Sequence, residues 1–112
     1  MSHDRGSRAE RRAAWWYRLH GYRILAANAW AGGYELDLVV RRGRRLVFCE
    51  VKEKAGLAFG TPAEMVDAEK QRRVRCAAAA WLELHPEHSG LYVSFDVISV
   101  QEGRLVRLAE AF

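Results

Sequence analysis

The sequence has few cysteines and no long hydrophobic run, and both shortages limit where the protein can work. Only two cysteines, Cys49 and Cys76, occur among the 112 residues, which argues against a disulfide-rich secreted fold. No apolar stretch is long enough to span a bilayer, and the charged residues 1–21 lack the apolar centre of a signal peptide. We therefore expect a cytoplasmic protein without membrane contact, in which both thiols are small buried apolar groups.

Linkers, repeats and low-complexity tracts are absent as well. Hydrophobic residues make up 50% of the chain, which is enough for a core and argues against a disordered chain. A chain of this length suits one small domain. We therefore expect residues 1–112 to form a single domain.

Negative charge is the scarcer sign. Lysine and arginine total 18 against 14 aspartates and glutamates, which gives a formal net charge of +4. Basic residues gather in three clusters, at 5–12, 41–45 and 70–75. Such clusters face phosphate more often than an even scatter does, because each neutralised phosphate releases counterions. Nucleic acid, with DNA favoured, is the expected partner, although a solvated surface rich in arginine explains the net charge alone equally well.

Hydrophobic periodicity predicts an order of helix, three strands, helix and two strands. Gly21 ends the first helix, and Thr61, Pro62 and Glu64 form a capping box that begins the second. This order predicts an α/β fold with a single mixed β-sheet flanked by helices. The expected ranges are 6–20 for the first helix, 22–30 for a strand that runs into a loop, 34–40 and 45–52 for the next two strands, 62–85 for the second helix, and 91–100 and 104–108 for the last two strands.

Two of the expected strands carry charges that buried strands normally lack. Glu35 and Asp37 lie in the second strand, and Glu50 and Lys52 lie in the third. Desolvating an unpaired charge is expensive, so these side chains need partners or a function. Alternation places Glu35 with Asp37 on one face of its strand and Glu50 with Lys52 on one face of the next.

The turn between these strands decides whether the two faces coincide. We expect a two-residue turn formed by Arg42 and Gly43. Asp37 then lies opposite Phe48 and diagonal to Glu50. A three-residue loop would shift the register by one position and send the charges to opposite faces. With the two-residue turn, all four charged side chains share one face.

Three carboxylates on one face repel each other and either raise a pKa or recruit a cation. Glu35, Asp37 and Glu50 offer the oxygen ligands that Mg2+ or Mn2+ prefers. Lys52 would lie beside such an ion, where an amine can orient or deprotonate an attacking water or hold a phosphate. This set suits metal-dependent hydrolysis of a phosphodiester. A structural ion pair on a solvated sheet face is the alternative.

Two charged residues fall on the inner faces of the expected helices. Glu10 borders the inner stripe of the first helix, and Lys70 lies four residues from both Val66 and Val74 in the second. Charges are uncommon on core-facing stripes unless they are paired. If both helices cover the same face of the sheet, Glu10 and Lys70 point at the carboxylates. A salt bridge between the helices is the alternative.

Other side chains are candidates for contact with nucleic acid. Trp30 lies in a loop beside two glycines, where an indole can stack on a base, whereas Trp16 and Trp81 have core spacing. Basic side chains near a hydrolytic site can hold phosphate. The basic candidates are Lys70, Arg73, Arg42 and Arg44.

Asp37, followed after 12 residues by Glu50, Val51 and Lys52, resembles the motif of the PD-(D/E)xK nucleases, which share the restriction-endonuclease-like fold. The chain as a whole resembles a family of small uncharacterised bacterial proteins often called YraN. It departs from that family at Tyr34, where glycine is usual, and at Cys49, where valine is usual. The matching stretches are GSRAERRA at 6–13, GYRIL at 21–25 with Asn28, ELDLV at 35–39, LVFCEVK at 46–52, FGTPAEMV at 59–66 with Lys70, and FDV at 95–97.

This resemblance implies an αβββαβ core and a nuclease-like site. Asp37 and Glu50 would be the metal ligands, Lys52 the catalytic lysine, and Glu10 a carboxylate that the first helix brings to the site. The implied activity is that of a Mg2+- or Mn2+-dependent endonuclease acting on DNA or branched nucleic acid.

Two other classes of function remain open from the sequence. One is a nucleic-acid-binding module that keeps the nuclease-like fold without turnover, and the other is a structural or adaptor protein. A homodimer is compatible with the first hypothesis, because two sites cut two strands more easily than one.

Overall fold

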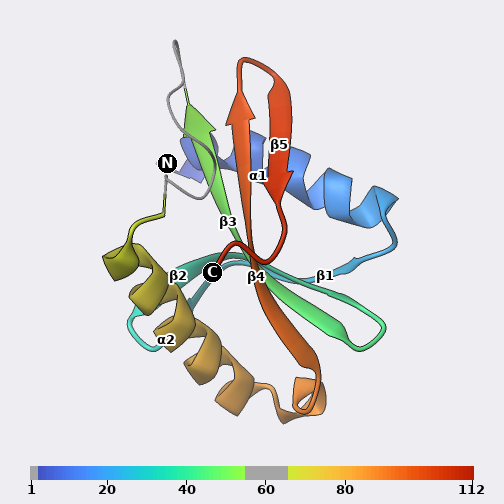
Figure 1. Ribbon diagram of the computed structural model, residues 1–112, viewed down its shortest axis with the longest axis vertical. Coiled ribbons are helices and arrows are strands. Elements are labelled where there is room, and N and C mark those ends of the chain that lie inside the picture. The colour runs from blue at the N-terminus through green and yellow to red at the C-terminus, as the bar shows by residue number, and fades with distance from the viewer. Residues whose placement is uncertain (1–2, 55–65) are drawn as a thin grey trace.

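The computed structural model describes residues 3–54 and 66–112. It shows a five-stranded sheet with two α-helices and one short 3-10 helix in these ranges (Figure 1). The elements are α1 (His3–Leu19), β1 (Arg23–Ala31), β2 (Tyr34–Arg42), β3 (Arg45–Lys54), α2 (Ala68–Leu84), η2 (Pro86–His88), β4 (Tyr92–Gln101) and β5 (Arg104–Leu108).

The sheet is mixed, and its strands follow the order β1-β2-β3-β4-β5. Neighbouring strands are antiparallel except β3 and β4, which are parallel. A parallel pair needs a crossover connection, and α2 lies in that connection. The expected α/β fold with one mixed sheet and the αβββαβ order are therefore confirmed, and this topology is consistent with a restriction-endonuclease-like core.

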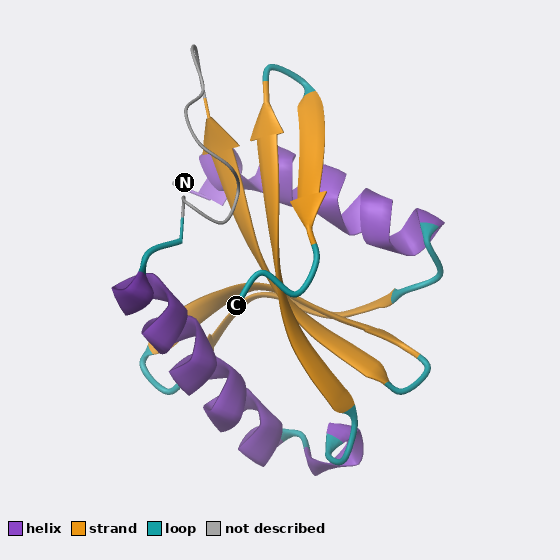
Figure 2. Ribbon diagram, viewed as in Figure 1, coloured by secondary structure: helices purple, strands orange, loops and turns teal. Residues whose placement is uncertain are grey.

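The two α-helices cover opposite faces of the sheet (Figure 2). Val47 of β3 belongs to the cluster formed with Tyr17 of α1. The adjacent Phe48 faces α2, where its ring lies edge-on to Trp81 at 5.8 Å between centroids. Successive residues of a strand point to opposite faces, so the assumption that both helices cover the same face is wrong.

Gly43 and Arg44 form the turn between β2 and β3, one residue later than expected. Gly43 has a φ of 61°, and a glycine with positive φ at the first central position is typical of a two-residue hairpin turn. The later turn pairs Phe48 with Val39 rather than with Asp37. Because each partner moves by two positions, the expected sharing of faces is retained.

The second helix begins at Ala68, six residues later than the expected start at position 62. Asp67 is the N-cap, and its side chain accepts a hydrogen bond from the backbone N–H of Lys70 at 2.8 Å. This bond satisfies one of the N–H groups that a helix start leaves without a partner. The expected capping box at 61–64 lies outside the described residues.

The inner stripe of α2 agrees with the periodicity of the sequence. Val74, Ala77, Ala78 and Trp81 are buried against the sheet. Cys76 falls between these positions and is exposed, so the expectation that both thiols are buried holds for Cys49 alone. Within the described residues, no helix has both the length and the apolar character needed to cross a membrane.

Gly32, in the turn between β1 and β2, lies close to α2. Its φ is +60°, and a Cβ added there would lie 3.0 Å from Ala80 Cβ and 3.3 Å from the carbonyl oxygen of Cys76. The neighbouring Gly33 also has a positive φ, of +86°, but a Cβ there would meet nothing within 4 Å.

We expect Gly32→Ala to lower the free energy of unfolding by about 1–3 kcal/mol more than Gly33→Ala, since both pay for positive φ but only the first overpacks against a helix. Urea unfolding of the two variants measures the difference. Equal losses in the two would show that the turn does not pack tightly on α2.

Candidate functional site

Asp37 and Glu50 lie where β2 and β3 stop pairing. The last pair of the register on this side is Leu38 with Cys49, so Asp37 and Glu50 are the next residues in line. Beyond that pair, the backbone N–H of Val51 donates to Asp37 Oδ2 at 2.8 Å. A side-chain carboxylate therefore takes the place of a strand carbonyl, and this holds Asp37 beside β3.

Glu50 is a buried carboxylate with an incomplete set of partners. Its side chain is 1% exposed, and neither carboxylate oxygen accepts a hydrogen bond from the part of the chain that the structure describes. Lys70 of α2 places its Nζ 3.2 Å from Glu50 Oε1, an ion pair that lacks hydrogen-bond geometry. A buried carboxylate without hydrogen bonds is costly, so this position needs an explanation beyond packing.

The charges of the site perturb one another. Burial, and then the neighbouring Asp37 carboxylate, raises the pKa of Glu50 to about 7, although Lys70 and Lys52 oppose the rise. Burial also raises the pKa of Asp37, against the hydrogen bond from Val51 and the positive charge of Lys70. Each carboxyl thus binds a proton more readily than an ordinary one, which is typical of functional sites.

Glu10 approaches the same carboxylates from the opposite face of the sheet. Burial raises its pKa, a hydrogen bond with Asn28 lowers it, and the charges of Asp37 and Glu35 raise it further. Asn28 itself has a φ of 53°, a conformation that asparagine tolerates better than most residues. Although the helices lie on opposite faces, the structure therefore brings both Glu10 and Lys70 to the place where β2 and β3 separate.

Glu35 lies on the rim of this site. Its side chain is exposed, and its strand partner on β1 is Trp30. No group of three or more histidine, cysteine, aspartate or glutamate side chains within residues 3–54 and 66–112 is arranged to hold a metal ion. Asp37 and Glu50 are thus a pair of oxygen donors, with Glu35 further out.

The arginine-rich turn lies at the other end of the hairpin. Arg42 is five residues from Asp37 along β2, or about 17 Å at the rise of a strand. It donates to the carbonyl oxygen of His20 at 2.8 Å, and Arg44 donates to that of Gly90 at 3.2 Å. Both side chains thus tie the turn to neighbouring segments, and their contact with nucleic acid stays a prediction.

The other predicted nucleic-acid contacts come from α2 and β1. Arg73 is exposed and forms an ion pair with Glu69 at 3.1 Å on the outer side of α2. Lys70 faces Glu50, as described above. Trp30 is at the end of β1 rather than in a loop, and its side chain is 70% exposed.

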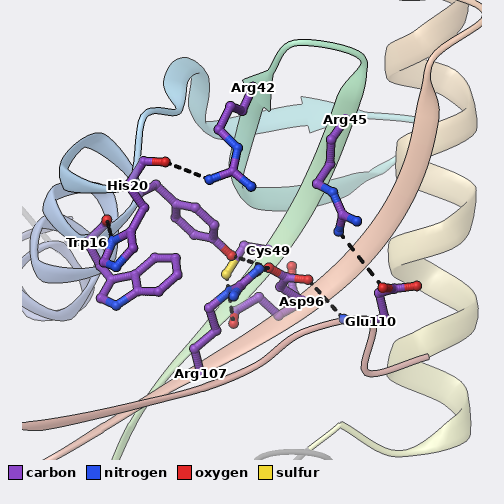
Figure 3. Close-up of polar contacts among 10 residues, drawn as sticks. Trp16, His20, Arg42, Arg45, Cys49, Asp96, Arg107 and Glu110 are labelled. Carbon is purple, nitrogen blue, oxygen red and sulfur yellow. Dashed lines mark hydrogen bonds and ion pairs between the residues drawn. The ribbon is translucent and has the colours of Figure 1, made fainter.

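Asp96 on β4 is also fully buried, and both of its carboxylate oxygens accept hydrogen bonds (Figure 3). Its Oδ2 accepts hydrogen bonds from Tyr17 Oη at 2.6 Å and from Arg107 Nε at 2.9 Å, and its Oδ1 accepts one from the backbone N–H of Glu110 at 3.0 Å. Burial above all raises the pKa of Tyr17, so the phenol stays a donor. Asp96 is therefore held by donors from α1, β5 and the C-terminal segment, and the sequence did not indicate these partners.

The Asp96 network links α1, β4, β5 and the C-terminal segment. We expect Asp96→Asn to lower the free energy of unfolding by about 3 kcal/mol, because Arg107 loses its buried counter-charge. Tyr17→Phe removes one hydrogen bond and should cost about 1 kcal/mol. Urea unfolding measures both losses, and a wild-type unfolding midpoint for Asp96→Asn would contradict a stabilising network.

Glu50 should make the stability of the protein depend on pH. Its pKa is about 7 in the folded protein, above its ordinary value of 4.5, so the folded state binds the extra proton between these two pH values. The contribution of Glu50 to the free energy of unfolding is fully present below pH 4.5 and is lost as the pH rises through 7.

We therefore expect Glu50→Gln to leave stability nearly unchanged at pH 4.5 and to raise it by about 2–3 kcal/mol at pH 8 in EDTA. Thermal unfolding across this pH range measures the difference, with exposed Glu53→Gln on the same strand as the control. A Glu50→Gln effect that does not change with pH would contradict the raised pKa.

Known proteins similar to this chain support a single family. Residues 9–100 match the family described as Uncharacterised protein family UPF0102. A UPF0102 protein of Methylorubrum extorquens is 44% identical over 112 residues, which cover 99% of this chain and 86% of that protein. One of Bartonella bacilliformis is 40% identical over 108 residues, which cover 96% of this chain and 87% of that protein. The chain therefore belongs to family UPF0102, the YraN-like family that its sequence motifs indicated.

Proposed function

We propose that this protein is a divalent-cation-dependent nuclease of the endonuclease type, which hydrolyses phosphodiester bonds in DNA or in branched nucleic acid. The observation that carries the proposal is the carboxylate of Glu50. It is buried, it accepts no hydrogen bond within the described chain, and it lies beside a second carboxylate, Asp37. Such an arrangement is unfavourable for a purely structural ion pair and suits a cation site.

The donor set fits Mg2+ or Mn2+. Both ions prefer oxygen ligands, and Mg2+ is commonly bound through one or two carboxylates, with waters and substrate phosphate completing its shell. Asp37 and Glu50 would hold the ion, and exposed Glu35 would contribute from the rim. When bound, the ion supplies charge neutralisation at the phosphoryl oxygen and activation of the attacking water.

The remaining charged groups have distinct roles in the proposal. The positive charge of Lys52 lowers the pKa of both Asp37 and Glu50, and in the proposal its amine orients a water or holds the phosphate that is attacked. Lys70 holds the Glu50 carboxylate in place through the ion pair. Glu10 has a raised pKa, a property of carboxyls that exchange protons with a reacting group.

Cleavage assays test the proposal with single-stranded, duplex, flap, four-way-junction and RNA substrates in Mg2+ or Mn2+. We expect wild type to cut at least one substrate. Lys52→Ala should reduce the rate by about 10²–10⁴-fold, as removal of a positioned proton-transfer or phosphate-binding group does, while exposed Glu53→Gln on the same strand leaves it unchanged.

A parallel calorimetric titration with Mn2+ measures the ion itself. Asp37→Asn should weaken Mn2+ binding at least about tenfold, because one of two carboxylate ligands loses its charge. Binding of nucleic acid without any cleavage by wild type would instead support a binding module that has lost turnover. Mn2+ binding that is unaffected by Asp37→Asn would count against the cation site.

A further inference from the structure

A groove of about 320 Å³ runs between α1 and β1, next to the carboxylate site. This size is at the lower end of the range of about 300–1,000 Å³ that is usual for small-ligand pockets. Its apolar lining comes from Ala14 on α1, Ile24 and Ala27 on β1, and Leu38 on β2. The groove thus has room for a small group with an apolar surface.

The mouth of the groove combines an aromatic and basic side chains. Trp15 lines the groove, and 58% of its side chain is exposed. The guanidinium of Arg18 lies 5.7 Å from the centre of the Trp15 ring, and Arg11 lines the same groove. An exposed indole beside guanidinium groups is the combination that proteins use to stack a base and hold its phosphate.

The polar end of the groove is continuous with the carboxylate site. Glu10 and Asn28 both line the groove, and the Asn28 side chain lowers the pKa of Glu10. The same Glu10 lies near enough to Asp37 and Glu35 for their charges to act on it. A ligand that fills the groove would therefore have its polar edge against a carboxylate and an amide, on the side of the groove lined by Leu38, the neighbour of Asp37.

We propose that this groove binds one unpaired nucleotide of the substrate, with its base stacked on Trp15, its phosphate at Arg18 and its polar edge toward Glu10 and Asn28. The inference rests on the proposed nuclease function and adds the substrate class, which is nucleic acid with a single-stranded segment next to the phosphate that is cut. Carboxylate and amide side chains are suitable partners for the amino and ring-nitrogen groups of a base edge.

The choice of an unpaired nucleotide follows from the geometry of nucleic acids. A base inside a duplex is stacked on both faces, and its edge is paired, so it enters a protein groove only after it is flipped out at a cost in unstacking. A nucleotide in a single-stranded segment, flap or junction arm avoids most of this cost. Charge complementarity between the two arginines of the mouth and a phosphate supports the same occupant.

Binding of fluorescently labelled oligonucleotides in Ca2+, followed by anisotropy, tests the inference separately from cleavage. Trp15→Ala should weaken binding of a single-stranded oligonucleotide about tenfold, which corresponds to the loss of one base stack, and should leave binding of a blunt duplex unchanged. Trp15→Phe keeps an aromatic ring and should retain most of the affinity. Leu19→Ala, on the same helix, is the control, because Leu19 is 76% exposed and its side chain does not line the groove.

A scan with abasic nucleotides identifies the stack itself. One abasic position in the strand should weaken binding by wild type as much as Trp15→Ala does, and the same position should have no further effect on Trp15→Ala. Affinity of Trp15→Ala equal to wild type, equal losses for strand and duplex, additive effects at every abasic position, or no binding of the strand by wild type would each overturn the inference.

These experiments separate failure of the nucleotide groove from failure of the proposed nuclease activity. A Trp15 effect without cleavage by wild type on any substrate would leave the nucleotide groove in place and remove the nuclease. Metal-dependent cleavage without a Trp15 effect on strand binding would do the reverse. Melting temperatures of the exposed-site variants Trp15→Ala and Leu19→Ala, measured alongside, confirm that each is folded.

Discussion

The burial of the Glu50 carboxylate is the constraint on which the rest of this site depends. A charge removed from water must be compensated by partners, or the group must take up a proton. Here the compensation is partial, because Lys70 supplies an ion pair at 3.2 Å but no donor completes a hydrogen bond within the described residues. Asp37 adds a second negative charge, and the pKa of Glu50 rises to about 7. The site is thus able to accept a positive charge or a proton.

Asp96 is a second buried carboxylate, and it differs from Glu50 in its hydrogen bonds. Both carboxylates are almost completely buried on neighbouring strands of one small sheet. Asp96 accepts hydrogen bonds from Tyr17, Arg107 and the backbone of Glu110, as a structural carboxylate should. Glu50 accepts none within the same described ranges. The two carboxylates are thus equally buried but differ in the number of hydrogen bonds that they accept.

The opposite placement of the two helices explains how so small a sheet assembles a site from four elements. β2 and β3 stop pairing at Leu38 and Cys49, and Asp37 bonds to the backbone N–H of Val51 beyond that point. Where the strands separate, side chains from both faces reach the same place. α2 contributes Lys70 from one side, and α1 contributes Glu10 from the other. The groove between α1 and β1 ends at this Glu10, which connects the carboxylates to a surface with an exposed indole.

The sequence by itself determined the order of elements, the inner stripe of α2 and the membership of Asp37, Glu50 and Lys52 in one charged group, because alternation and helical periodicity are local properties. It placed the turn one residue early and began α2 six residues early, since several residues near each boundary suit a turn or a cap. Only the tertiary structure decided that the helices lie on opposite faces, that Asp96 accepts three hydrogen bonds, and that Glu50 accepts none from residues 3–54 and 66–112 apart from its ion pair with Lys70. Those facts depend on contacts between residues far apart in the chain, and no local pattern encodes them.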